Sequence, residues 1–180
     1  WEIAQEKANK LGKLSAEEEQ QQRKEECRQI GTAVAQKYLD HPHLQDILAV
    51  VNNYPEGKKD LIRLVTLSCL VGAIDLKSLN LEKAIQGVAM LEPRSQRVLE
   101  QITQLTQEYE QAETRAREGL QSKVKETLHR LRISGTAVGD INIEVLPQQQ
   151  SGQQLLERLR PRLDTLKQEL TCLFRSNLLK

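Results

Sequence analysis

The residues in this sequence best suited to chemistry are two histidines on either side of a proline. His41 and His43 flank Pro42, with Asp40 and Asp46 close by. Two imidazoles and a carboxylate can bind a transition metal. Histidines in a helix-breaking loop are more often ordinary loop residues, so we treat His41 and His43 as weak metal-ligand candidates. A metal-dependent enzyme at this loop is our second alternative function.

Motifs for nucleophilic catalysis and for nucleotide binding are missing from the sequence. None of the three histidines accompanies a serine or cysteine in a nucleophile motif, and the nine glycines do not fall into a phosphate-loop spacing. Cys27, Cys69 and Cys172 are far apart and form no C-x-x-C pair, which argues against a disulfide framework or a zinc site and favours a reducing, cytoplasmic setting. We therefore expect no catalytic residue and no cofactor, and we consider an enzyme the less favoured class.

The composition predicts helices and no strong attraction to a polyanion or a membrane. Aromatic residues are only 3% of the chain, so a core must be built from Leu, Ile, Val and Ala. The net charge is +1, which gives no general electrostatic pull toward nucleic acid. The longest apolar run, residues 61–74, contains Arg63 and is too short to span a bilayer. Because the chain begins at Trp1 rather than Met, we expect either a fragment of a longer protein or a chain that lacks some disordered residues.

The first half of the sequence predicts a small helical bundle over residues 1–92. Proline and asparagine punctuation separates helical patterns at residues 15–39, 44–51, 55–74 and 81–91, after a first amphipathic helix at residues 1–11. The pattern at 61–74 is apolar nearly all round, as in a helix at the centre of a core. On the helix at 15–39 we expect Cys27, Ile30, Val34 and Tyr38 to form the buried face.

The stretch from residue 94 to 133 contains no proline and one glycine, and it predicts a single long helix. Val98, Ile102, Leu105 and Tyr109 are spaced by 4, 3 and 4 residues, the period of a helix that lies along a partner helix. After Ala116 the spacing between apolar residues of this predicted helix changes. Leu120, Val124 and Leu128 follow at intervals of 4, so the apolar stripe drifts around the helix as it does at a stutter.

A second heptad pattern near the C-terminus supplies the partner. Six leucines are spaced by 3, 4, 3, 4 and 3 residues: Leu156, Leu159, Leu163, Leu166, Leu170 and Leu173. Pro161 falls opposite this seam, where it either kinks the helix or marks its true start. Because the earlier helix is longer, roughly 40 residues against about 25, part of it needs another contact, and we expect that part to be around Val98 to Tyr109.

The segment near 134–146 is the only one whose sequence pattern predicts β structure. A turn at Gly139-Asp140 would place alternating apolar side chains on one face of a two-stranded ribbon. The proposed interaction residues on this face are Val138, Ile141, Ile143 and Val145. Since an isolated two-stranded hairpin is marginal in water, we expect this face to meet another surface, in this molecule or in a second copy.

Positive charge is expected to gather where the two long helices fold back on each other. The basic residues concerned are Lys123, Lys125, Arg130, Arg132, Arg158, Arg160 and Arg162. Together with Glu126 and Glu157 they would leave an excess of positive charge that could attract RNA or an acidic protein. Such residues commonly only solubilise the flanks of a coiled coil, so a nucleic-acid- or ribosome-associated factor is our less favoured alternative.

The sequence thus predicts a mainly α protein of two parts. Residues 1–92 form a helical bundle, and residues 93–180 form a long antiparallel coiled-coil hairpin with a short β-hairpin between its arms. We predict a non-catalytic interaction or scaffold protein, whose partner is protein and in the first place itself, as a homodimer or larger homo-oligomer. No membrane association is expected.

Overall fold

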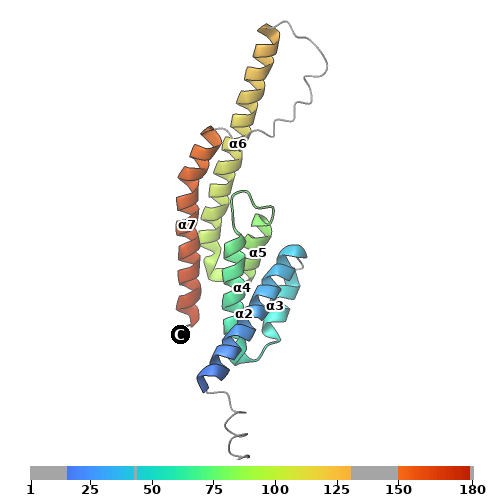
Figure 1. Cartoon of the computed structure of the whole chain (residues 1–180), viewed down its shortest axis with the longest axis vertical. Helices are drawn as coiled ribbons and strands as arrows, with labels where there is room; N and C mark the ends of the chain where they lie inside the picture. Colours follow the sequence, from blue (N-terminus) through green and yellow to red (C-terminus); the bar gives the residue numbers. More distant parts are fainter. Residues whose placement is uncertain (1–15, 43, 131–149, 179–180) are drawn as a thin grey trace, which may run out of the picture. The chain divides into compact units, whose positions relative to one another are not determined.

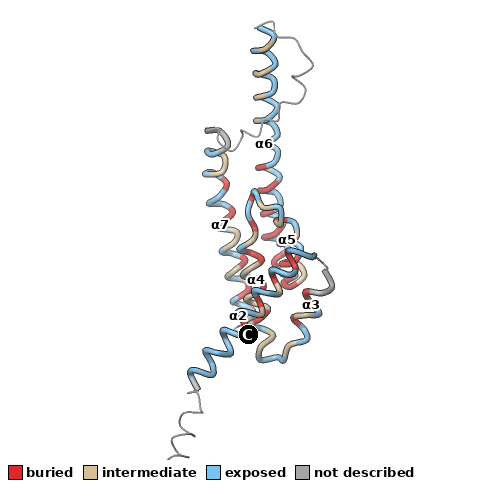
Figure 2. The backbone as a smooth tube through the Cα atoms, turned by 45° about the vertical axis from the view of Figure 1, so that its right-hand side comes forward, coloured by how far each residue is buried: buried red, intermediate tan, exposed pale blue. Residues whose placement is uncertain are grey.

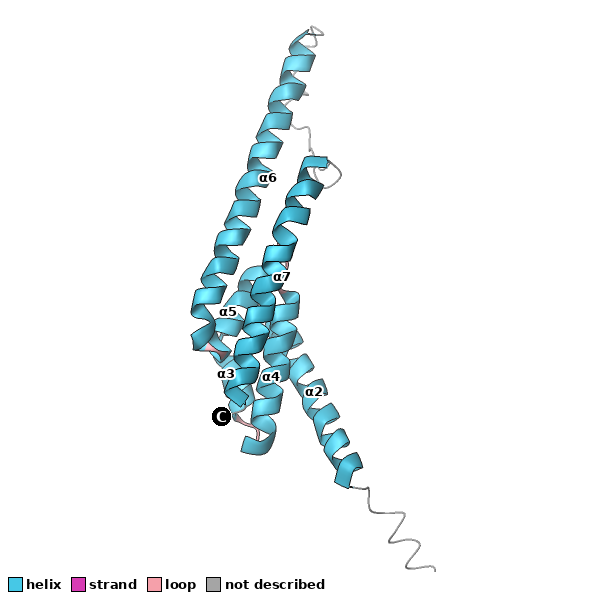
Figure 3. Cartoon of the chain, turned by 90° about the vertical axis from the view of Figure 1, so that its left-hand side faces the viewer, coloured by secondary structure: helices cyan, strands magenta, loops and turns pink. Residues whose placement is uncertain are grey.

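The computed structural model describes residues 16–42, 44–130 and 150–178, and these are mainly α-helical (Figures 1 and 3). No strand occurs within these ranges. The helices are α2 (Ala16–Asp40), α3 (Leu44–Asn52), α4 (Glu56–Ala73), α5 (Leu81–Leu91), α6 (Gln96–Arg130) and α7 (Gln150–Leu178), with a short 3-10 turn η1 (Pro93–Ser95) before α6. The mainly α prediction is confirmed. The predicted helix at 1–11 and the predicted ribbon near 134–146 lie outside the described residues.

The chain divides into two compact units. One contains Trp1–Arg94 together with Thr171–Lys180, and the other contains Ser95–Leu170. The change of unit falls two residues after the predicted boundary at 92/93. The end of the chain, predicted to belong with 93–170, is grouped instead with the first unit.

Helix α2 is solvated at its start and buried toward its end. Residues 17–26 are all exposed, whereas Cys27, Ala35 and Tyr38 are buried (Figure 2). The predicted burial of Cys27 and Tyr38 is confirmed. The prediction for Ile30 and Val34 was wrong in part, because both are only half-buried and the face between Cys27 and Tyr38 is completed by Gly31 and Ala35. Small residues take this place because α2 approaches α4 very closely here.

Gly31 is the point of closest approach between α2 and α4. A Cβ added at Gly31 would lie 2.7 Å from Cβ of Val65 and 3.0 Å from the carbonyl oxygen of Ile62. The hydroxyl of Thr66, buried in α4, lies 3.2 Å from the carbonyl oxygen of Gly31 and 2.8 Å from that of Ile62. The missing side chain therefore lets a buried hydroxyl bridge the two helix backbones, which leaves no unsatisfied polar group at this point of the core.

Helix α4 is the centre of the first unit and contacts α2, α3 and α5, most extensively α2. Its buried residues are Ile62, Thr66, Leu67, Leu70 and Val71. The prediction of a central apolar helix starting near Pro55 is confirmed, with Pro55 as its N-cap residue. Its own carbonyl accepts the first two bonds of the helix, from the amides of Lys58 and Lys59.

Basic side chains fasten the ends of neighbouring helices in the first unit. Lys83 Nζ donates to the carbonyl oxygen of Leu39 at the end of α2, over 2.9 Å. Arg63 of α4 donates to the carbonyl oxygen of Leu91 at the end of α5 and lies 3.9 Å from the Glu92 carboxylate. Cations at helix C-termini bind carbonyl groups that have no partner within the helix and oppose the helix dipole. These bonds tie the start of α5 to the end of α2, and the end of α5 to the middle of α4.

A surface ion pair joins the middle of α2 to the first turn of α4. Lys58 Nζ lies 2.9 Å from a carboxylate oxygen of Glu26. The hydrogen bond from Lys58 lowers the pKa of Glu26, and the same bond raises the pKa of Lys58. Both groups are exposed, so solvent screening keeps the contribution of this pair to stability small.

Tyr38 is packed against α5 without a hydrogen bond for its hydroxyl. A Cβ added at Gly87 of α5 would lie 2.7 Å from Cε1 of Tyr38, so the ring occupies the place of a side chain there. The residue is 4% exposed. Its hydroxyl is buried with no partner among the described residues. Desolvation by burial raises the pKa of Tyr38.

In the second unit, α6 is buried over its first half and exposed over its second. Val98, Leu99, Ile102, Leu105 and Tyr109 are buried, whereas no residue from 110 to 130 is fully buried (Figure 2). On α7 the buried side chains include Leu159, Leu163 and Leu170, and Leu156 and Leu166 are half-buried. Helix α7 begins before Pro161 and continues through it, which excludes a start at Pro161. Pro161 is exposed, as predicted from its position opposite the leucine seam.

Replacement of Gly31 by Ala should lower the free energy of unfolding by about 1–2 kcal/mol, because overpacking against Val65 and the backbone of Ile62 outweighs the gain in helix propensity. Gly119→Ala in the middle of α6 is the matched control, since nothing lies within 4 Å of its added Cβ. We expect that variant to be more stable than wild type by about 0.5–1 kcal/mol. Urea unfolding followed by circular dichroism measures both, and equal effects of the two substitutions would contradict the close approach at Gly31.

Replacement of Tyr38 by Phe should raise the free energy of unfolding by about 1 kcal/mol, because it removes a buried hydroxyl that lost its hydration on folding. Tyr54→Phe, at a half-buried residue between α3 and α4, should change it by less than about 0.5 kcal/mol. The same urea titration measures both. A loss of stability in Tyr38→Phe would mean that the hydroxyl is hydrogen-bonded in solution.

Candidate functional site

The register of α6 and α7 in the second unit is marked by one carboxylate between two arginines. Glu108 of α6 lies 3.1 Å from Arg158 and 3.0 Å from Arg162 of α7, each arginine pairing with a different carboxylate oxygen. Arg158 and Arg162 are four residues apart and therefore lie on one face of α7. The two helices run in opposite directions beside each other (Figures 1 and 3). Glu108 is thus level with the turn between the two arginines.

This register leaves the last third of α6 without α7 beside it. Counting back about ten residues from the turn between Arg158 and Arg162 reaches Gln150, where α7 begins, and counting forward equally from Glu108 reaches about Glu118. Helix α6 continues from there to Arg130. Figure 1 shows this part of α6 extending beyond the first turn of α7. We call residues 117–130 the overhang.

The overhang carries apolar side chains at every fourth position. Leu120, Val124 and Leu128 are each half-buried, while the residues between them are exposed. We call these three residues the apolar ridge. Their four-residue spacing differs from the 4, 3, 4 spacing of the buried Val98, Ile102, Leu105 and Tyr109. The change of spacing after Ala116 therefore coincides with the place where α7 begins.

The expectation about which part of α6 lacks cover was wrong. We expected α7 to leave the portion around Val98 to Tyr109 uncovered, but Glu108, next to Tyr109, pairs with Arg158 and Arg162, and the rest of α7 runs from there along the earlier turns of α6. The error came from not knowing the register of α7. The sequence did contain a usable signal, because the even 4, 4 spacing at Leu120, Val124 and Leu128 departs from the pattern of a helix paired along its length.

The basic residues singled out from the sequence fall into separate groups. Arg158 and Arg162 pair with Glu108. Lys123 follows Glu108 by 15 residues, which is roughly 22 Å along the helix, so the structure does not bring it beside those arginines. Lys125 is in the overhang with Lys123, and Arg130 pairs there with Glu126 at 2.6 Å. Arg132 lies outside the described residues.

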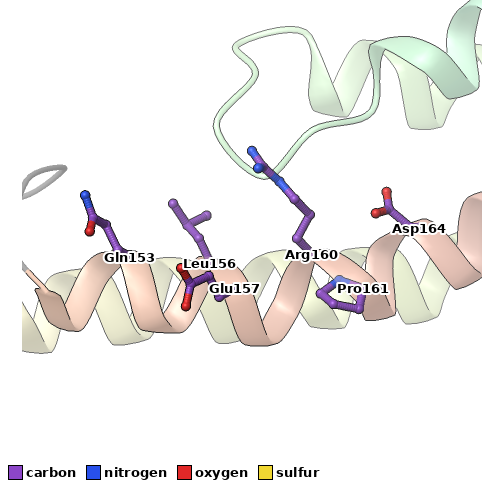
Figure 4. A pocket seen from close by; sticks show the side chains of 6 residues that line it. All are labelled: Gln153, Leu156, Glu157, Arg160, Pro161 and Asp164. Atoms are coloured by element: carbon purple, nitrogen blue, oxygen red, sulfur yellow. The ribbon is translucent and has the colours of Figure 1, made fainter.

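Arg160, the remaining basic candidate, lines an open hollow of about 470 Å³ beside α7. The lining residues are Gln153, Leu156, Glu157, Arg160, Pro161 and Asp164 (Figure 4). Figure 4 shows Arg160 and Asp164 extending to the same side of α7, one turn apart. Pro161 has no amide hydrogen for the carbonyl of Glu157, so one helix bond is missing next to this hollow. The hollow offers one cation and two carboxylates along a single helix.

The remaining predicted site residues give no assembled centre. His41 is exposed just after the end of α2. His43 lies outside the described residues, as do Val138, Ile141, Ile143 and Val145. Over the ranges that the structure covers, no group of three or more His, Cys, Asp or Glu side chains could hold a metal ion. Among the same residues, no helix is long and apolar enough to cross a membrane.

Comparison with protein-family models, characterised proteins and solved structures found no match.

Replacement of Glu108 by Ala should lower the free energy of unfolding by about 0.5–1 kcal/mol at low salt, because it leaves Arg158 and Arg162 facing each other without a carboxylate. The effect should shrink in 1 M NaCl, where the Debye length is about 3 Å. Glu110→Ala is the control, since Glu110 is exposed and its carboxylate has no ion-pair partner in the described part of the chain. Urea unfolding at both salt concentrations checks this, and equal values for the two variants at low salt would contradict it.

Proposed function

We propose that this chain is a non-catalytic coiled-coil interaction or scaffold protein, and that the overhang of α6 is one of its working surfaces. The observation that carries the proposal is the apolar ridge of Leu120, Val124 and Leu128, which continues along α6 beyond the start of α7. A regular row of half-buried apolar side chains on a helix is typical of a surface that a partner helix covers.

The length of the overhang supports the same proposal. It contains about 14 residues, close to the length at which an isolated helix is marginal in water. Glu126 and Arg130, one turn apart, add one favourable pair along it. The bond from Thr127 to the carbonyl of Lys123 is local and fastens nothing to α7. A second helix on the ridge would supply the tertiary contact that stabilises most protein helices.

The finer architecture that goes with this function is an antiparallel coiled-coil hairpin with a β-hairpin near residues 134–146, in a protein of the cytoplasm. The buried Leu159, Leu163 and Leu170 on α7 support the coiled-coil part. Self-association as a homodimer or larger homo-oligomer is also proposed. It would use the alternating apolar residues Val138, Ile141, Ile143 and Val145, which lie outside the described residues.

Binding of nucleic acid is the alternative function. It is favoured by Lys123 and Lys125, which are exposed and have no acidic partner among the described residues. It is disfavoured by the pairing of Arg158 and Arg162 with Glu108, which removes two cations from the patch that the sequence predicts. Lysines on phosphates would give binding that weakens steeply with salt.

The chain should scatter light as a dimer or larger assembly at micromolar concentration. A variant with Ile141→Asp and Ile143→Asp should be monomeric, because buried carboxylates without partners are costly. Asn142→Asp is the matched control, since the predicted ribbon places residue 142 on its opposite face. Size-exclusion chromatography with multi-angle light scattering measures the mass, and circular dichroism checks that the helices persist. A wild-type chain that stays strictly monomeric over a hundredfold range of concentration would remove self-association from the proposal.

A further inference from the structure

The apolar ridge of the overhang is bordered by lysine on both sides. Lys123 and Lys125 directly precede and follow Val124 in sequence, and each residue turns the helix by about 100°. The two side chains therefore leave the helix on opposite sides of the ridge. Both are exposed. The carboxylate of Glu126 leaves on the far side, about 200° from Val124, and it is held there by Arg130 at 2.6 Å.

The residues on either side of the apolar contact between two helices largely decide which partner helix is bound. In paired helices the apolar row supplies most of the binding free energy, and the charges beside it select partner and orientation. Here both positions that flank Val124, the central residue of the ridge, are cationic. A second copy laid across the same ridge would bring Lys123 and Lys125 against their own counterparts, which is unfavourable. A nucleic acid would satisfy the lysines but would leave Leu120, Val124 and Leu128 in water.

We propose that the apolar ridge binds an amphipathic helix of another protein whose flanking positions are acidic. The four-residue spacing of Leu120, Val124 and Leu128 forms a row inclined to the helix axis, and two such rows interlock when helices cross at about −50°. The partner helix therefore crosses α6 instead of extending the paired arrangement that α6 makes with α7. This inference rests on the proposed function, because it names the partner class of the same surface.

Two synthetic helical peptides test the proposal against the full chain. Both have leucine at every fourth position. One has glutamate on either side of each leucine, and its twin has lysine there. Titration calorimetry at low salt should show the glutamate peptide binding about tenfold more tightly than the lysine peptide, as expected for two exposed charge pairs changed from like to opposite. The difference should shrink as salt screens the flanks.

Three variants separate the ridge from its flanks. Lys123→Glu with Lys125→Glu should reverse the preference, so that the lysine peptide binds more tightly. Val124→Asp should abolish binding of both peptides. Ser122→Asp is the matched control, because Ser122 is exposed and lies about 160° around the helix from Val124, and it should leave both affinities within about twofold of wild type. Circular dichroism confirms that the helices of each variant are intact.

Other occupants of the ridge would give different results. Equal affinity for the two peptides would overturn the acidic partner and leave the proposed interaction protein standing. If the wild type is a dimer and Val124→Asp converts it to a monomer, the acidic partner is overturned and the ridge binds a second copy of this chain. Binding of neither peptide, with salt-sensitive binding of a single-stranded RNA that Lys123→Glu with Lys125→Glu removes, would overturn it in favour of nucleic acid. Binding of neither peptide and no RNA would also overturn it, and light scattering of the wild type then decides separately whether the chain self-associates.

Discussion

Helix α6 extends beyond the start of α7, and the candidate surface depends on this difference. With Glu108 between Arg158 and Arg162, α7 begins level with about Glu118, and α6 runs on to Arg130. The ion pairs mark this register more than they create it, because exposed pairs contribute little to stability. Burial of Ile102 and Leu105 on α6, and of Leu159 and Leu163 on α7, contributes more to stability than these exposed pairs do.

A second constraint shapes the bundle of α2 to α5, where close backbone contact replaces large side chains. Gly31 lets α2 approach α4 until Thr66 reaches a carbonyl on each helix. Gly87 of α5 likewise leaves space for the ring of Tyr38. In a chain with few aromatic residues, such contacts recover packing density that bulky side chains would otherwise provide. The cost, within the part of the chain that the structure describes, is the buried hydroxyl of Tyr38, which has no hydrogen-bond partner there.

Charge on this protein acts locally, although the chain as a whole is nearly neutral. Some charges hold helices in place, as Lys83 and Arg63 do at the ends of α2 and α5. Others are left beside an apolar row, as Lys123 and Lys125 are. The second kind is the basis of the proposed function and of the acidic partner, because a flanking charge selects a partner only where it is not already paired.

The sequence by itself determined the helices and most of their buried faces. Proline and asparagine punctuation and apolar period were enough to locate α2 to α7, because these signals are local. They left two positions for the start of α7, and only the structure places Pro161 inside the helix. The tertiary structure decided the register of α6 and α7, the separation of Arg158 and Arg162 from Lys123, and the use of Gly31 and Ala35 in place of Ile30 and Val34. Each of these depends on which residues of two distant segments lie level with each other. The same heptad pattern is compatible with several such alignments. The even spacing of Leu120, Val124 and Leu128 hinted at the uncovered part of α6, but the register of α7 was needed to locate it.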